Sequence, residues 1–134
     1  IMRDPLTMIA SDGGVVVYKR GAPHPRNYGT FARVLGVYVR DKHVLSWEEA
    51  IRKMTSLPAM RLKLYDRGVL RPGMKADIVI FDAATVRDRA TFADPHQYAE
   101  GFSYVLVNGG VVLDNGKMTD ARTGQILKGP AARK

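Results

Sequence analysis

Apolar positions in the first part of the chain follow two different spacings. The short apolar run Leu6–Ala10 stops at a Ser-Asp-Gly-Gly sequence over residues 11–14, which predicts a buried strand followed by a glycine-rich turn. Residues 15–29 contain two prolines and two glycines and predict a loop. From residue 30 to 39 the apolar side chains recur three and four positions apart, as Phe31, Val34 and Tyr38 do, and this spacing predicts an amphipathic helix.

Two more helices are predicted before residue 65. Ser46 precedes Trp47, Glu48 and Glu49 and has the pattern of a capping box, in which Ser46 caps the helix and the Glu49 side chain reaches back to it. We expect this helix to bury Ile51 and Met54. A third helix is expected with Pro58 at its first position. It would bury three apolar side chains, those of Met60, Leu62 and Leu64.

The second half of the chain changes to the pattern of strands and tight turns. The run from Ala76 to Asp82 is apolar at successive positions, which predicts a strand buried on both faces. Residues 104–107 and 110–113 flank Asn108-Gly109 and predict a hairpin with a type I′ turn. Asn115-Gly116 predicts a second turn, residues 83–101 read as irregular, and we expect the tail from Gly129 to fray.

Composition and charge narrow the classes of function. The 134 residues carry a net charge of +8, and the first 76 residues hold all of this excess, with 14 Lys and Arg against 6 Asp and Glu. Such a surface can attract nucleic acid, but there is no block of like charges and no aromatic RNA-binding motif, so we expect no specific nucleic acid partner. No apolar run approaches the ~18 residues of a membrane span, and we expect no membrane partner. Cysteine is absent, which agrees with a cytoplasmic protein and excludes thiolate metal sites.

Asp12 is the residue whose position most strongly indicates chemistry. It follows an apolar strand, and the carboxyl ends of strands face the active site in barrels of parallel strands. An aspartate before glycine also commonly caps a turn through backbone amides, and both interpretations stay open at this point. His24, in the sequence Pro-His-Pro-Arg, and Arg26 are weaker candidates for substrate binding. His43 and His96 read as surface or structural residues, and no histidine spacing in the chain indicates a metal site.

Several stretches resemble the C-terminal region of one enzyme family, the N-acyl-D-amino-acid deacylases. These enzymes belong to the metal-dependent amidohydrolase superfamily. The resemblance covers nearly the whole chain, and the stretch His24–Arg40 favours the deacylase branch, whereas the later stretches are shared across amidohydrolases. The similar stretches are residues 11–13, 24–33, 35–40, 56–59, 66–73, 76–82 and 107–109.

The resemblance implies an α/β parent fold, a (β/α)8 barrel joined to a small β-domain. Residues 1–64 would then form the end of the barrel, namely its last strand, a loop and about three helices. Residues 65–134 would form the C-terminal part of the small β-domain, as a small antiparallel β region. The chain begins with Ile1 and lacks the histidine motifs of the family, so we expect it to be a C-terminal piece of a longer enzyme.

The resemblance also implies the reaction and its cofactor. The parent would be a zinc-dependent hydrolase that removes the acyl group from N-acyl-D-amino acids. Zinc would lower the pKa of a bound water, and Asp12 would take up the proton and return it to the departing amine. Asp12 is also a candidate zinc ligand, with the other ligands outside this chain. We therefore expect the piece alone to be inactive, to bind no zinc, and to form a homo-oligomer that covers its open apolar face.

Two other hypotheses remain. In the first, the chain would be a stand-alone basic binding module derived from an amidohydrolase tail. In the second, it would be a piece of a different amidohydrolase, similar to dihydroorotases or hydantoinases. The stand-alone module predicts a start codon close to Ile1. An enzyme predicts that the open reading frame continues upstream into a His-x-His motif, so sequencing upstream distinguishes the binding module from the enzymes.

Overall fold

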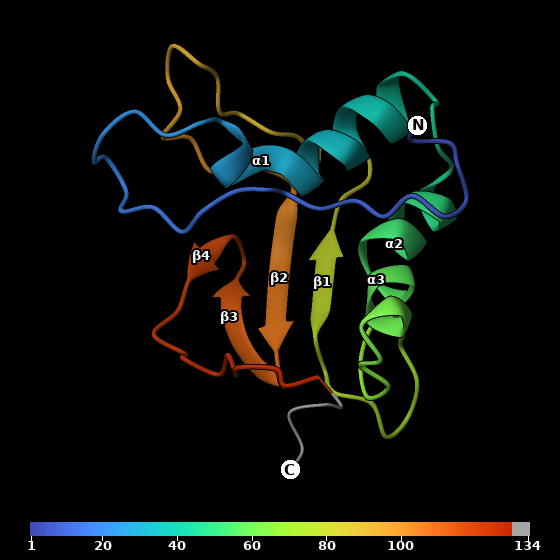
Figure 1. Cartoon of the computed structure of the whole chain (residues 1–134). Helices are drawn as coiled ribbons and strands as arrows, with labels where there is room; N and C mark the ends of the chain where they lie inside the picture. Colours follow the sequence, from blue (N-terminus) through green and yellow to red (C-terminus); the bar gives the residue numbers. More distant parts are fainter. Residues whose placement is uncertain (130–134) are drawn as a thin grey trace.

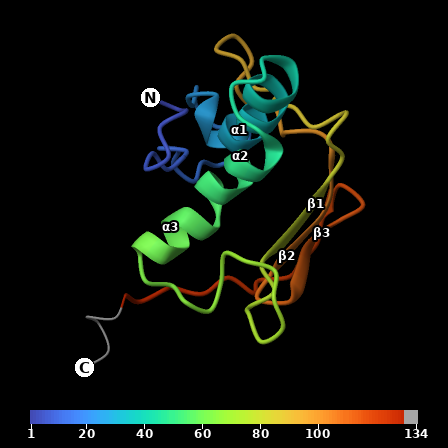
Figure 2. The ribbon, with the colours of Figure 1, turned by 90° about the vertical axis from the view of Figure 1, so that its right-hand side faces the viewer.

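The computed structural model describes residues 1–129, which form a layer of short helices against one side of a four-stranded antiparallel sheet (Figure 1). The helices come first along the chain and the strands follow. Figure 2 shows the sheet nearly edge-on, with the helices on one side of it. Among these residues, no helix has the length and apolar character needed to cross a membrane.

The N-terminal extended segment, residues 7–12, crosses the helical layer in Figure 1 but forms no strand, so the expected buried strand Leu6–Ala10 is wrong for this chain. Its side chains are exposed in part, with Leu6 82% and Met8 41% accessible. A strand requires a neighbouring strand to receive its backbone hydrogen bonds, and no strand within residues 1–129 pairs with this segment. It is instead held by the helical layer, where the Ile9 N–H donates to the Lys53 carbonyl over 3.1 Å.

Helix α1 (Arg26–Arg33) continues directly into the π-helix η1 (Val34–Asp41). The helical run therefore starts four residues before the predicted Thr30. Pro25 precedes it with a φ of −52°, and its fixed ring geometry suits the start of a helix. Val34, Leu35 and Val39 are buried, as their spacing predicted, whereas Phe31 remains 43% exposed.

Helix α2 (Trp47–Met54) begins at the predicted cap. The Ser46 hydroxyl accepts the Glu49 backbone N–H at 3.2 Å, which confirms the N-cap. The other predicted contact, from the Glu49 side chain back to Ser46, is wrong. The Glu49 carboxylate turns towards Arg52 instead, with contacts of 2.7 and 2.8 Å. The expected burial of Ile51 is also wrong, since α2 turns Ala50 and Lys53 inwards and leaves Ile51 39% exposed.

Helix α3 (Ser56–Arg61) starts two residues before Pro58, which was expected at its first position. Met60 and Leu62 are 60% and 61% exposed, so their predicted burial is wrong. The reason is the placement of α3, which extends away from the sheet in Figure 2 and turns only Ala59 into a buried position.

The four strands lie in chain order, and every pair is antiparallel: β1 (Ile78–Phe81), β2 (Phe102–Val107), β3 (Gly110–Asp114) and β4 (Lys117–Met118). The hairpin between β2 and β3 is confirmed, with φ values of 48° at Asn108 and 84° at Gly109 as a type I′ turn requires. The second turn, at Asn115-Gly116, is confirmed between β3 and β4. These strands confirm the small antiparallel β region.

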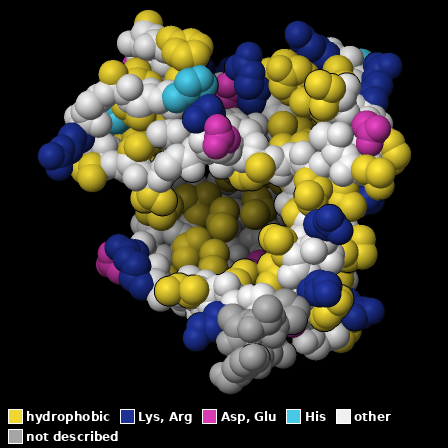
Figure 3. Space-filling model, in the orientation of Figure 1, with side chains coloured by type: hydrophobic (Ala, Val, Ile, Leu, Met, Phe, Trp, Pro, Cys, Tyr) yellow, Lys and Arg dark blue, Asp and Glu magenta, His cyan; other side chains and the backbone are white. Residues whose placement is uncertain are grey.

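The expected burial of β1 on both faces is wrong. Val79 and Ile80 are 52% and 50% exposed. Strand β1 lies at the edge of the sheet, and the helical layer leaves part of the sheet uncovered. Figure 3 shows the resulting hollow, which lies below α1 and is lined by apolar side chains.

The core consists of two hydrophobic clusters that share Trp47 and Met54. One cluster lies within the helical layer around Val39 and Ala50, and the other joins that layer to the sheet through Leu35 and Val86. The two predicted domains, residues 1–64 and 65–134, therefore contact each other through common side chains. The prediction that the tail frays concerns mainly residues 130–134, which lie outside the described residues.

Candidate functional site

Asp12 lies at the end of the N-terminal extended segment, with a φ of 48° and a side chain that is 85% exposed. Its carboxylate pairs with Arg26, the first residue of α1, at 3.0 Å between Nη1 and Oδ2. Among the described residues it accepts no backbone hydrogen bond; the nearby turn is closed by Ser11, whose hydroxyl accepts the Gly13 N–H at 3.2 Å. The arrangement therefore does not support Asp12 as a turn cap.

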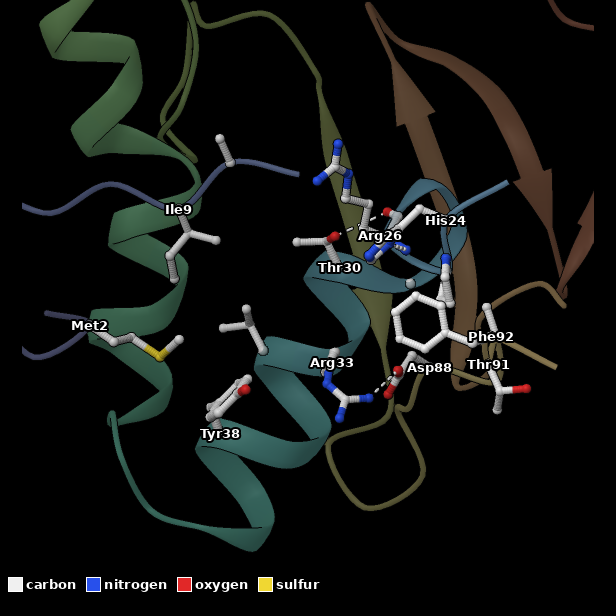
Figure 4. A pocket seen from close by; sticks show the side chains of 15 residues that line it. Met2, Ile9, His24, Arg26, Thr30, Arg33, Tyr38, Asp88, Thr91 and Phe92 are labelled. Carbon is white, nitrogen blue, oxygen red and sulfur yellow. Dashed lines mark hydrogen bonds and ion pairs between the residues drawn. The ribbon is translucent and has the colours of Figure 1, made fainter. Parts of the chain in front are cut away.

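A cavity of about 540 Å³ lies beside this ion pair (Figure 4). The N-terminal segment forms one wall through Ile9 and Ala10, α1 forms another, and Phe92 lies on the far side. His24 also lines the cavity, as does Arg26, so the structure brings both weaker candidates together there. The His24 ring lies edge-on to Phe92 with 4.9 Å between ring centroids.

The charged side chains around this cavity are paired, and one nitrogen of His24 is occupied. His24 Nδ1 accepts the backbone N–H of Arg26 at 3.0 Å. Arg33 donates to Asp88 at 2.8 Å, and this hydrogen bond raises the pKa of the guanidinium above its ordinary value. Because Arg26 pairs with Asp12 and Arg33 with Asp88, both positive charges at the cavity are neutralised by carboxylates.

The described residues do not assemble a metal site. No three His, Cys, Asp or Glu side chains within residues 1–129 converge closely enough to hold an ion. His24 lies in the cavity and His96 lies in a separate cluster, so the histidines do not meet at Asp12. Asp12 is therefore a single carboxylate donor beside an arginine.

Sequence reasoning missed an aromatic cluster around His96, which it treated as a surface or structural residue. Tyr28 approaches His96 Nδ1 with its hydroxyl at 2.8 Å, and Tyr18 stacks on Tyr98 with 5.1 Å between ring centroids. Burial, together with Tyr98 and Tyr18, raises the pKa of the Tyr28 hydroxyl. These side chains come from distant parts of the chain, so no local motif could have revealed the cluster.

Comparison with known proteins identifies relatives for nearly all of this chain. The profile of the amidohydrolase family matches residues 1–113. An N-acyl-D-aspartate deacylase and a D-aminoacylase, both from Alcaligenes xylosoxydans xylosoxydans, are each 46% identical to the chain over 95% and 94% of its length. An N-acyl-D-glutamate deacylase from the same organism is 44% identical over 98%. The chain spans about a quarter of the length of these relatives, 25 to 26%.

Solved structures of the same kind of enzyme share the fold. A D-aminoacylase described as defining a novel subset of amidohydrolases superposes with a TM-score of 0.75 at 47% identity, over 77% of this chain and 22% of its own. An N-acyl-D-glutamate deacylase from Bordetella bronchiseptica, complexed with zinc and a phosphonate mimic of the tetrahedral intermediate, gives 0.74 at 47% identity, over 79% and 22%. The chain belongs to the amidohydrolase family.

Proposed function

We propose that this chain is the C-terminal quarter of a zinc-dependent N-acyl-D-amino-acid deacylase. The observation that carries this proposal is the identity of 44 to 46% over almost the full chain to three relatives, each of which is a deacylase or aminoacylase of D-amino acids. In the parent enzyme, Leu6–Ala10 would be the last strand of the barrel. Its extended conformation, with no partner strand within residues 1–129, fits a strand whose neighbours belong to the rest of the parent.

Asp12 is the residue of this chain that acts on the reacting atoms in this proposal. Its carboxylate would take a proton from the attacking water and deliver it to the nitrogen of the departing amine as the amide C–N bond breaks. Two features support the role: Asp12 ends the extended segment, and its side chain is exposed rather than bound to backbone amides. The products would be a carboxylate and a free D-amino acid.

The residues described here do not form a complete zinc site by themselves. A carboxylate is a suitable zinc ligand, but a zinc site generally has three or four protein ligands, and the described residues bring no such group together. The remaining ligands would belong to the part of the parent that precedes this chain. Asp12 would contribute at most one oxygen to the metal, and the arginine at 3.0 Å would compete for that carboxylate.

His24 and Arg26 are assigned different roles in this proposal. Both line the cavity, which supports a place near the substrate. Arg26, however, already pairs with Asp12, so it would orient the carboxylate rather than bind a substrate anion. His24 would contact substrate through Nε2, because its Nδ1 is occupied by the Arg26 backbone.

The Asp12→Asn variant of the parent enzyme tests the assignment. Asparagine keeps the size of the side chain but cannot carry the proton, and general acid–base catalysis contributes roughly 10²- to 10⁴-fold in rate. We expect kcat for N-acyl-D-amino acids to fall at least about a hundredfold, with a much smaller change in KM and with zinc retained.

Three measurements on the purified variant decide the outcome: kcat, zinc content by elemental analysis, and melting temperature. Near-normal kcat would overturn the catalytic role of Asp12. The wild-type parent serves as the control, and its failure to release D-amino acids from acylated substrates would overturn the proposed activity itself. A different amidohydrolase would instead show turnover of cyclic amides.

A further inference from the structure

The loop between Asp12 and Arg26 is closed at its base by the ion pair of these two residues. The chain leaves the extended segment at Asp12, makes an excursion over residues 13–25, and returns at the first residue of α1. Gly13 lies close to the returning chain, because a Cβ placed there would lie 3.0 Å from the Cα of Asn27. The start of the loop therefore has a defined position beside Asp12.

The far part of this loop is held by one histidine from the second half of the chain. His96 Nε2 lies 3.0 Å from the Gly21 carbonyl oxygen, and its Nδ1 lies 3.2 Å from the Lys19 backbone nitrogen. The Tyr28 hydroxyl approaches the same Nδ1 at 2.8 Å. His96 precedes β2 and so connects the β region to the loop that follows Asp12.

The partners of His96 define its hydrogen-bonding form. A carbonyl oxygen only accepts, so Nε2 carries the proton and donates to Gly21. A backbone N–H only donates, so Nδ1 accepts from Lys19. The neutral ring protonated at Nε2 satisfies both contacts at once.

Aromatic packing supports the same contact. Tyr18, next to Lys19 in the loop, stacks on Tyr98, and the two rings are inclined by 14°. Tyr28 lies edge-on to both His96 and Tyr98, with 5.6 Å between centroids in each case. The loop is therefore held by aromatic packing in addition to the hydrogen bonds of His96.

We propose that His96 is a positioning residue that holds the loop of residues 13–25 in place beside Asp12 and thereby governs how the parent enzyme binds its substrate. This proposal rests on the proposed function, because loops after barrel strands surround the active site and determine substrate binding. His96 acts through Lys19 and Gly21 and does not touch the reacting atoms. Its loss affects substrate binding more than proton transfer, because Arg26 still orients Asp12.

Limited proteolysis of the parent enzyme by trypsin tests the loop directly. Lys19 and Arg20 are exposed tryptic sites within the loop, and the backbone on either side of this pair is bound by His96. We expect His96→Ala to increase cleavage after these two residues at least about fivefold, since two hydrogen bonds that oppose local opening are lost. His43→Asn is the matched control: His43 is an exposed histidine with a φ of 49°, which asparagine tolerates, and its variant should be cleaved like the wild type.

Two conservative variants distinguish the positioning of the loop by His96 from a general effect on the stability of the enzyme. His96→Asn retains an acceptor near Nδ1, and His96→Gln retains a donor near Nε2, so each should give intermediate cleavage while melting temperatures stay close to that of the wild type. For the alanine variant we expect KM for N-acyl-D-amino acids to rise about tenfold and kcat to change less than about threefold.

The two readouts distinguish failure of this proposal from failure of the proposed function. Unchanged tryptic cleavage in all three His96 variants would overturn the role of His96, whatever the substrate. Increased cleavage with an unchanged KM would also overturn it, because the loop would then not govern substrate binding. A wild-type parent that hydrolyses no N-acyl-D-amino acid would overturn the proposed function, while the cleavage comparison would still decide whether His96 holds the loop.

Discussion

At the scale of single residues, Lys53 joins the helical layer to the N-terminal segment. Its side chain is fully buried on α2, and its ammonium group donates to the backbone carbonyls of Asp4 and Thr7, the latter at 3.0 Å. Glu49 supplies a negative charge at 3.3 Å. A buried ammonium is stable only when its charge and its N–H groups are satisfied, and here the partners are one carboxylate and two carbonyls.

Lys53→Met in the parent enzyme removes the donor from the Thr7 carbonyl and from Glu49, while the Asp4 carbonyl still accepts the Thr7 backbone N–H at 3.2 Å. The expected cost is about 1–3 kcal/mol, seen as a melting temperature several degrees below that of the wild type. Lys117→Met, at an exposed position in β4, is the control and should melt within about one degree of the wild type. Equal melting of both variants would show that the Lys53 contacts add nothing to stability.

Glu49 makes the stability of the folded chain depend on pH in a defined direction. Hydrogen bonds from Arg52, and to a lesser extent Lys53, lower the pKa of its carboxyl from 4.5 to about 2. The stabilisation is therefore complete above pH 4.5, the pKa in the unfolded chain, and is lost as the pH falls towards 2. We expect Glu49→Gln to melt below the wild type at neutral pH and to converge with it as the pH approaches 2. A constant difference across this range would contradict the assignment.

At the scale of elements, one glycine allows the strand β2 to start against the helical layer. Gly101 directly precedes β2 with a φ of +86°, and a Cβ there would lie 2.5 Å from the Cα of Val86. Val86 is fully buried in the cluster that joins helices to sheet. Only a residue without a side chain can accept both the positive φ and this approach of two backbones.

Gly101→Ala in the parent enzyme should therefore destabilise the junction between sheet and helices. The strain at positive φ and the clash with Val86 together are expected to cost roughly 1–3 kcal/mol or more. Gly124→Ala is the matched control, because a Cβ added there would have no neighbouring atom within 4 Å and its φ lies outside the positive range. The melting temperatures of the two variants are compared with that of the wild type. A normal melting temperature for Gly101→Ala would contradict the predicted strain at this position.

Elements were predictable from sequence where the deciding partner is close in the chain. Ser46 caps a residue three positions away, and Asn108-Gly109 joins two adjacent strands, so both signals are local. The exposure of Val79 was not predictable, since it depends on which parts of the sheet the helices cover. At the site, the position of Asp12 after an apolar run is a local signal, and its catalytic role stays a prediction. Its pairing with Arg26 and the contacts of His96 depend on tertiary structure that no spacing reveals.

At the scale of the whole molecule, apolar surface remains open on the described residues. Val79 and Ile80 of β1 are half exposed, and Leu6 near the N-terminus is 82% exposed. Figure 3 shows apolar side chains lining the hollow beside these elements. Surfaces of this kind are normally covered by another part of the same chain or by another chain.

We expect the chain of residues 1–134, expressed alone, to associate into dimers or larger oligomers that cover this surface. Light scattering over a range of concentrations measures the mass directly. Val79→Lys places a charge on the exposed part of edge strand β1 and should shift the population towards monomer. A wild-type chain that stays monomeric at high concentration would contradict the prediction.

Trp47 lies where its fluorescence reports on the core that the helical layer and the sheet share. It is the single tryptophan of the 134 residues, it belongs to both hydrophobic clusters, and its ring lies 5.9 Å from that of Phe81 on β1. Separation of the helical layer from the sheet would expose the indole to water and shift its fluorescence to longer wavelength. The chain thus contains a built-in reporter, and emission from one residue follows the docking of its two halves without any added label.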